Sequence, residues 1–333
     1  MPDPLVQTSR LGPLTASQLD AALERFGLGS LITAEPASTG NFGQNVFLTT
    51  TSGDYVLRGH PLVPGQFAKE RYFAEVFHDQ CEVPAPWPYL YEPDCGIFGW
   101  PYAILGMVSG LQVADEEIYG RLTDTERRQL AASLGETAAR ISAVRRPGCG
   151  RWDADSESVQ PFQPNWSTWV VDAIREEADR SLGISASERS WLAGKLDRAA
   201  RCLPEPAEGC LLHGDFSYFN ATADRVDGVL RAAGVYDLSW ATFGHQDAQL
   251  PRQYAVFLDQ DPALATIFLR AALAGRDDLD PLRMELMMIS ERISIWAWAK
   301  QSGRGWWSPD LGFADWLGRY LDAIRFDVEA PVS

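Results

Sequence analysis

The spacing of hydrophobic and polar residues predicts a strand-rich first part of the chain. Three short apolar runs at 31–37, 46–50 and 55–58 are separated by small and polar residues, which is the pattern of β-strands joined by short loops. A further apolar run at 102–105 stops at Gly106 and predicts another buried strand. We therefore expect a small β-sheet in this part of the chain.

Helical spacing dominates the remainder. Leu130, Leu134, Ala138 and Ile141 recur at three- and four-residue intervals, which places them on one face of a helix at 123–144. Similar patterns predict helices at 15–26, from 67 onward, and at 166–182, 188–203, 248–258, 262–273, 282–300 and 313–325. Residues 145–163 show no periodicity, so we expect an exposed loop there.

Length and composition indicate a globular protein with more than one lobe. At 333 residues and 46% hydrophobic content, the chain is long for a single domain and rich enough in apolar residues to bury a core. The five cysteines are scattered without a CxxC pair, which favours reduced thiols. The N-terminus lacks a signal-peptide pattern, and no apolar run is long enough to cross a membrane. We therefore expect a soluble cytoplasmic protein.

The charge balance narrows the ligand class. A net charge of −16 leaves no basic stripe for nucleic acid, so nucleic-acid binding is not expected. Such acidity suits a cationic ligand, although plain solubility is the alternative explanation. Lys69, Lys195 and Lys300 are the only lysines, against twenty-six arginines.

The candidate chemistry lies in one segment, 211–240. It contains His213-Gly214-Asp215, then Asn220 after four intervening residues, and Asp237 after an apolar run. Phosphoryl transfer requires a carboxylate beside the attacking hydroxyl and oxygen ligands that hold Mg²⁺ against the nucleotide phosphates. We interpret Asp215 as the candidate catalytic base and Asn220 and Asp237 as candidate metal ligands. Short motifs also occur by chance, so ordinary loop residues are the alternative.

A hairpin is expected between the two halves of this motif. Apolar residues at 221–222 and 229–236 flank turn-forming residues at 224–228. Two strands joined there would bring Asn220 and Asp237 close together.

A loop between the first two predicted strands is a candidate phosphate-binding element. It contains Ser38, Thr39, Gly40, Asn41 and Phe42, and the backbone N–H groups of such small-residue loops can cradle phosphates. The full G-x-G-x-x-G spacing is missing, so an ordinary hairpin loop is the alternative.

Arg58 and Glu70 form a second candidate element for nucleotide binding. Kinases place a cation on the third strand to hold the α- and β-phosphates and pair it with a carboxylate on the next helix. Arg58 ends the third predicted strand, and Glu70 lies on the helix that follows. Arginine replaces the usual lysine but can bind phosphate through two nitrogens. A purely structural ion pair is the alternative.

The motifs carry a family resemblance. His213-Gly214-Asp215 departs from the H-R-D of protein kinases and resembles the H-G-D or H-A-D of the aminoglycoside phosphotransferase superfamily. DYVLRGHPLVPGQFAKERYFAEVF at 54–77 looks like the matching region of the hygromycin B phosphotransferases, and the similarity recurs at HGDFSYFN and VYDLSWATFG. It covers most of the chain at low identity.

The resemblance implies an α+β, two-lobed, protein-kinase-like fold. Residues 1–106 would form a small β-rich nucleotide-binding lobe, and residues 107–333 a larger helical lobe for catalysis and acceptor binding. Leu105 would be the gatekeeper, with the carbonyl of Gly106 and the amide of Val108 facing the adenine edge. An ordinary strand end is the alternative at these positions.

One position departs from the family. A Gly-Asp pair followed by another acid usually anchors the catalytic loop, whereas this chain has Gly244-His245 with Asp247 two residues on. We expect the change to affect the packing of the loop rather than its chemistry. A packing role for His245 is preferred over a role as base, because Asp215 already supplies the carboxylate.

The acceptor pocket is implied by the resemblance alone. Asp259, Asp261 and Glu291 lie near a group of tryptophans in the last third of the chain, and they are candidates for binding substrate ammonium groups. Charges on a solvated helix surface are the alternative.

The implied function is phosphate transfer from ATP, or from GTP, with Mg²⁺ to a hydroxyl of a small cationic acceptor. An aminocyclitol antibiotic of the hygromycin type is the first choice, and the protein would act as a monomer or homodimer. A kinase of another small alcohol, such as a macrolide, choline-like or sugar substrate, is one alternative, and a catalytically inactive nucleotide-binding module is another. A protein kinase is disfavoured because Gly214 replaces the usual arginine and no A-P-E motif follows Asp237.

Overall fold

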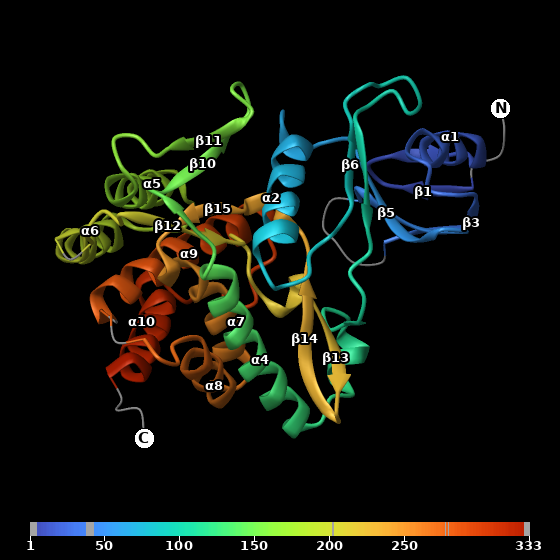
Figure 1. Ribbon diagram of the computed structural model, residues 1–333. Helices are drawn as coiled ribbons and strands as arrows, with labels where there is room; N and C mark the ends of the chain where they lie inside the picture. Colours follow the sequence, from blue (N-terminus) through green and yellow to red (C-terminus); the bar gives the residue numbers. More distant parts are fainter. Residues whose placement is uncertain (1–4, 38–42, 202, 277, 279, 330–333) are drawn as a thin grey trace.

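The computed structural model describes residues 5–37, 43–201, 203–276, 278 and 280–329, which form an α+β fold with a sheet-rich N-terminal part and a helical C-terminal part (Figure 1). The predicted small sheet is present. Its strands lie in the order β3 (Leu31–Pro36), β4 (Asn45–Thr50), β5 (Gly53–Gly59), β7 (Tyr102–Gly106) and β6 (Tyr89–Glu92), and neighbouring strands are antiparallel.

A hairpin and the first helix cover this sheet. β1 (Val6–Thr8) pairs with β2 (Gly12–Leu14), and α1 (Ala16–Phe26) follows. A capping box begins this helix, because the Thr15 hydroxyl accepts from the Gln18 amide while the Gln18 side chain accepts from the Thr15 amide. The buried face of α1 packs against Val46, Leu57 and Ile104 of the sheet. These residues form a small hydrophobic core that is separate from the large core of the protein.

α2 (Gln66–Gln80) lies between the small sheet and the helical part (Figure 1). Phe67, Phe73 and Phe77 are fully buried and belong to the large core that continues into the helical part. α2 therefore ties the sheet to the rest of the molecule, and it carries Glu70 on a buried face.

The predicted helices of the second part are confirmed with small shifts at their ends. They are α4 (Asp124–Ser142), α5 (Trp166–Arg180), α6 (Ala186–Ala200), α7 (Pro251–Gln260), α8 (Pro262–Ala272), α9 (Pro281–Ser302) and α10 (Phe313–Glu329). The structure adds a short helix that was not predicted, α3 (Glu116–Gly120). α8 and α9 each begin with proline directly after an aspartate cap, at Asp261 and Asp280. Proline at the first helical position costs no hydrogen bond, and the aspartate accepts from the exposed amides.

The prediction of a loop at 145–163 is wrong. This stretch contains β9 (Arg145–Pro147), β10 (Gly150–Asp153) and β11 (Ser158–Pro161). With β12 (Glu208–Leu212) and β15 (Thr242–Gly244) they form a sheet in the order β11-β10-β15-β12-β9. Strands of three or four residues are too short to show an alternating pattern, and partners far away in sequence hold them in place.

The hairpin predicted inside the catalytic segment is confirmed. β13 (Ala221–Val226) pairs with β14 (Val229–Val235), and β8 (Leu111–Gln112) joins as a third strand. Asp227 and Gly228 form the turn with φ of 52° and 78°, as the left-handed positions of a tight hairpin require.

The lobe division at Gly106 stays a prediction. β7 ends at this residue, while the next strand, β8, already pairs with β13 of the second part. In the part of the chain that the structure describes, no helix combines the length and apolar character needed to span a membrane.

Candidate active site

His213 joins the two strand ends that carry the candidate catalytic residues. Its ring is fully buried, and Nε2 lies 2.9 Å from the carbonyl oxygen of Tyr236, next to Asp237. Burial lowers the pKa of His213, so the ring is neutral. A carbonyl only accepts, so Nε2 is the nitrogen that carries the proton. The ring therefore holds the loop after β12 against the end of β14.

The backbone conformation and a close neighbouring carbonyl both require glycine at position 214. Its φ is 83°, and a Cβ atom there would lie 2.0 Å from the carbonyl oxygen of Trp240. Any side chain would push apart the two segments that carry Asp215 and Asp237, so glycine between His213 and Asp215 has a physical cause.

Asn220 fixes one oxygen of Asp215. Its side-chain N–H group donates to Asp215 Oδ2 at 2.9 Å and to the backbone carbonyl of Asp215 at 2.9 Å. Both donations come from Nδ2, so Oδ1 of Asn220 is the atom able to ligate a cation. The predicted base and the first predicted metal ligand are therefore in direct contact.

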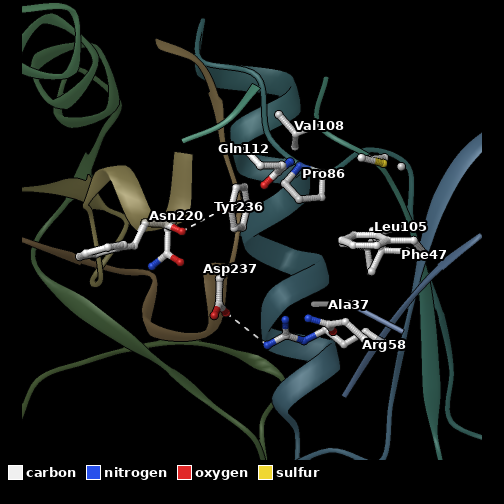
Figure 2. A pocket seen from close by; sticks show the side chains of 15 residues that line it. Ala37, Phe47, Arg58, Pro86, Leu105, Val108, Gln112, Asn220, Tyr236 and Asp237 are labelled. Carbon is white, nitrogen blue, oxygen red and sulfur yellow. Dashed lines mark hydrogen bonds and ion pairs between the residues drawn. The ribbon is translucent and has the colours of Figure 1, made fainter. Parts of the chain in front are cut away.

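Asp237 faces the same cavity as Asn220 (Figure 2). The hairpin brings the two together, since the amide of Tyr236 donates to the carbonyl of Asn220 at 2.9 Å. Asp237 has a φ of 62°, which aspartate tolerates better than most residues. Burial alone would raise the pKa of Asp237, but the Arg58 guanidinium and the Ser239 hydroxyl outweigh it and lower that pKa, so the group is a carboxylate.

The predicted ion pair between Arg58 and Glu70 is present. Arg58 Nε lies 3.1 Å from Glu70 Oε2, and Arg58 Nη2 lies 3.2 Å from Asp237 Oδ1. Glu70 is only 2% exposed, and it also accepts from the Tyr89 hydroxyl at 2.7 Å. Burial opposes the charge on Arg58, but Glu70 and Asp237 raise its pKa above the ordinary value. Arg58 therefore links the small sheet to the candidate metal ligand.

A cavity of about 160 Å³ lies beside these charges. Figure 2 shows Asn220 and Asp237 on one side and Phe47 and Leu105 on the other. Val56, Pro86 and Tyr236 also belong to the largely apolar lining, which suits a flat aromatic base.

The predicted hinge residues also lie at this cavity, where Leu105, Gly106 and Val108 form part of the wall. Gly106 has a steric cause, because a Cβ atom would lie 2.0 Å from the carbonyl oxygen of Trp87. The predicted phosphate-binding residues Ser38, Thr39, Gly40, Asn41 and Phe42 lie outside the described residues. Ala37 and Asn45, on either side of that loop, line the cavity.

The three predicted acceptor carboxylates have partners within the protein. Asp259 forms an ion pair with Arg319 at 2.6 Å and accepts from the Tyr320 hydroxyl at 2.9 Å. Asp261 caps α8 by accepting from the Ala263 amide at 2.9 Å. These contacts explain both carboxylates without a ligand.

Glu291 is the one of the three that connects to the candidate base. Its Oε1 lies 3.3 Å from Arg252 Nη1 and 2.6 Å from Arg292 Nη2. Arg252 Nε in turn lies 3.0 Å from Asp215 Oδ1. Arginines on both sides outweigh burial and lower the pKa of Glu291.

Three side chains that no sequence motif indicated contact the loop that carries Asp215. Gln249 accepts from the His213 amide at 3.0 Å, and Gln253 accepts from the Tyr218 amide. Together with Arg252 they are spaced by three and four residues, so one face of the turn that opens α7 contacts the loop. Three polar residues on one helical face, with no charged partner nearby in sequence, were the available signal.

Asp247 and His245 contact residues other than Asp215, Asn220 and Asp237. Asp247 is fully buried and forms ion pairs with Arg276, at 2.6 Å, and with Arg283. His245 stacks on Trp166 with ring centroids 5.9 Å apart, and its Nδ1 accepts from the Asp247 amide. The loop is thus anchored by Gln249 and Gln253 rather than by an acid.

No cluster of three or more His, Cys, Asp or Glu side chains that could hold a metal occurs among the described residues. Asn220 and Asp237 nevertheless fit Mg²⁺, because this ion is commonly held by one or two protein oxygen ligands together with nucleotide phosphates.

Comparison with protein families agrees with this geometry. Residues 33–283 match the model described as the phosphotransferase enzyme family. The chain belongs to this family. It is accordingly a phosphotransferase of the small-molecule kinase class. A comparison with curated protein sequences gives no match.

Solved structures share the kinase-like fold. The aminoglycoside phosphotransferase APH(4)-Ia is 20% identical with a TM-score of 0.66, over 95% of this chain and 100% of that one. Its ternary complex with AMP-PNP and hygromycin B, a thermostable mutant, is 20% identical with a TM-score of 0.62 over 93% and 98%. The GDP and kanamycin complex of APH(2″)-IIIa is 17% identical with a TM-score of 0.61 over 92% and 96%. At these identities the likeness concerns the fold alone.

Proposed function

We propose that this phosphotransferase uses ATP and Mg²⁺ to phosphorylate a hydroxyl of a small cationic acceptor, with an aminocyclitol antibiotic of the hygromycin type as the first choice. The observation that carries the proposal is the convergence of Asp215, Asn220 and Asp237 through the His213 ring and the β13–β14 hairpin. These are the side chains that phosphoryl transfer needs at one place.

Each residue has a defined role in the proposed reaction. Asp215 takes the proton of the acceptor hydroxyl, whose oxygen attacks the γ-phosphorus while the bond to the β-phosphate oxygen breaks and ADP leaves. Asn220 and Asp237 hold the magnesium ion, which neutralises phosphate charge when bound. Arg58, held by Glu70, binds the α- and β-phosphates. Leu105, Gly106 and Val108 hold the base.

Domain organisation follows the same proposal. Residues 1–106, with the loop at 38–42, bind the nucleotide, and residues 107–333 bind the acceptor. The protein acts in the cytoplasm as a monomer or homodimer.

Two observations support a cationic acceptor. The net charge of −16 attracts cations, and the neighbouring structures APH(4)-Ia and APH(2″)-IIIa are complexes with hygromycin B and with kanamycin. One observation favours the second candidate, a kinase of another small alcohol. Asp259 and Glu291 already pair with arginines, so they offer less charge to a polycation than their number suggests.

An acceptor panel tests the proposal. ADP release is measured with ATP or GTP and Mg²⁺ over aminocyclitols, other aminoglycosides, macrolides, choline-like alcohols and sugars, with controls that lack acceptor or contain a chelator. We expect chelator-sensitive, acceptor-dependent release with at least one aminocyclitol. Release only with another alcohol supports the second candidate. Nucleotide binding without release on any acceptor contradicts both and indicates an inactive module.

A further inference from the structure

The second oxygen of Asp215 has a partner on the acceptor side. Asn220 holds Oδ2 at 2.9 Å, and Arg252 Nε lies 3.0 Å from Oδ1 as an ion pair. The carboxylate is thus contacted at both oxygens by groups from two different elements, the catalytic loop and α7. Because the last torsion of aspartate is broad, a carboxylate held at one oxygen would rotate more freely.

Arg252 also forms an ion pair with Glu291. Glu291 Oε1 lies between Arg252 Nη1, at 3.3 Å, and Arg292 Nη2, at 2.6 Å, while Oε2 contacts Arg292 Nε. Arg292 is 1% exposed and lies over the rings of Trp316 and Tyr320, at 5.7 and 5.0 Å from their centroids. The series of contacts through Asp215, Arg252, Glu291 and Arg292 therefore runs from the loop after β12 to the aromatic residues of α10.

We infer that Arg252 is a positioning residue for Asp215, and that Glu291 acts through Arg252 rather than on the acceptor. The inference rests on the proposed function, in which Asp215 is the base. Both oxygens of Glu291 face arginines of the protein, so an acceptor ammonium group would have to displace them. The Arg252 guanidinium lies between the two carboxylates as an ion-pair partner of both, and its planar group is more rigid than an ammonium group on a flexible stem.

The chain offers a matched control on the same helix. Glu285 of α9 is also buried, and it pairs with two cations, Lys195 and Arg325, but has no contact with Arg252 or Asp215. Glu285→Gln therefore removes an equivalent charge from the same helix without changing the contacts between Asp215, Arg252 and Glu291. An effect that Glu285→Gln and Glu291→Gln share then reflects the loss of a buried charge on α9, and only an effect specific to Glu291→Gln reflects its contact with Arg252.

The test compares R252Q, R252K, E291Q and E285Q in acceptor-dependent ADP release at saturating nucleotide. We expect kcat to fall about 10²-fold in R252Q, the size of loss that follows a small misplacement of a reacting group, with little change in acceptor KM. E291Q should lose roughly tenfold in kcat, and E285Q should keep wild-type kcat. R252K keeps the charge but not the planar guanidinium, so it should recover only part of the activity lost in R252Q. The double variant R252Q/E291Q should be no slower than R252Q alone.

Three outcomes would overturn the inference. One is an unchanged kcat in R252Q, and another is a loss in E291Q that E285Q matches. The third is a rise in acceptor KM in E291Q at constant kcat, which would make Glu291 an acceptor ligand.

A second readout does not depend on turnover. Crystal structures of R252Q and E291Q should show the Asp215 carboxylate rotated away from its wild-type orientation, with that of E285Q unmoved. An unmoved carboxylate in R252Q overturns the positioning role. If the wild type phosphorylates no acceptor, the proposed function fails, and this structural comparison still decides the positioning role.

Discussion

The two sides of the catalytic loop use their charges differently. On the proposed nucleotide side, Arg58, Asn220 and Asp237 all line a cavity. On the proposed acceptor side, Asp259 and Glu291 face arginines of the protein itself. Charged side chains are therefore open to a cavity on the first side, whereas on the second side the presence of a carboxylate does not by itself indicate ligand binding. On the second side, the carboxylates hold helices and loops in place.

The largest expected effect is at the buried ion pair of the nucleotide side. Arg58→Met leaves the almost fully buried Glu70 side chain without its cation, and removing one partner of such a pair costs about 3–5 kcal/mol of unfolding free energy. Arg58→Lys keeps a charge, so it should retain nucleotide affinity within about tenfold, a difference of about 1.4 kcal/mol. Denaturant unfolding and nucleotide titration measure both. If Arg58→Met were as stable as Arg58→Lys, Arg58 would not be the partner that Glu70 needs.

Gly214→Ala tests the close approach of the segment that carries Asp215 to the segment that carries Asp237. The new Cβ atom meets both a φ of 83° and the Trp240 carbonyl oxygen, whereas Gly228→Ala at φ 78° has no atom within 4 Å. The control should lose about 1–2 kcal/mol from left-handed strain alone. Gly214→Ala should lose more than the control and should also lose phosphate transfer. Equal losses of stability in the two variants would show that the close approach to Trp240 does not matter.

A smaller effect is expected on the acceptor side at Asp259. Asp259→Asn weakens a partly exposed pair with Arg319, so the unfolding free energy should fall by about 1 kcal/mol. Acceptor KM should stay within about threefold, because the carboxylate faces Arg319 and Tyr320. A rise in KM of tenfold or more would place Asp259 in the acceptor site and remove the contrast between the two sides.

The smallest effect concerns pH. Burial lowers the pKa of His245, and the nearby Asp247 offsets this only in part. The unfolded chain therefore takes up a proton near pH 6.5 that the folded protein takes up only at lower pH, so stability is lost as pH falls below 6.5. His245→Asn keeps a capping acceptor and should reduce this slope, which is at most about 1.4 kcal/mol per pH unit for one proton. Identical pH profiles for the two proteins would contradict the lowered pKa.

The sequence predicted those features that depend on local spacing. The hairpin and the closeness of Asn220 and Asp237 follow from motifs within a few residues, and the partnership of Arg58 with Glu70 follows from one strand and the next helix. Helices were predictable because their apolar faces repeat over many turns.

Features that depend on distant partners were not predictable. β9 and β10 pair with the distant strands β12 and β15, and the ion pair of Arg252 with Asp215 arises only when the fold brings the two together. The pairing of Asp259 and Glu291 with arginines likewise appears only when α7, α9 and α10 are packed together.

Parallel measurement of nucleotide binding and phosphate transfer in Asp215→Ala and Asp237→Ala tests the central claim most directly. Asp215→Ala should bind Mg²⁺ and a non-hydrolysable ATP analogue like the wild type but lose transfer by about 10²- to 10⁴-fold, as expected for loss of a general base. Asp237→Ala should lose both transfer and the magnesium dependence of binding. Undiminished transfer in Asp215→Ala, or unchanged magnesium-dependent binding in Asp237→Ala, would contradict the assignment of base and metal ligand.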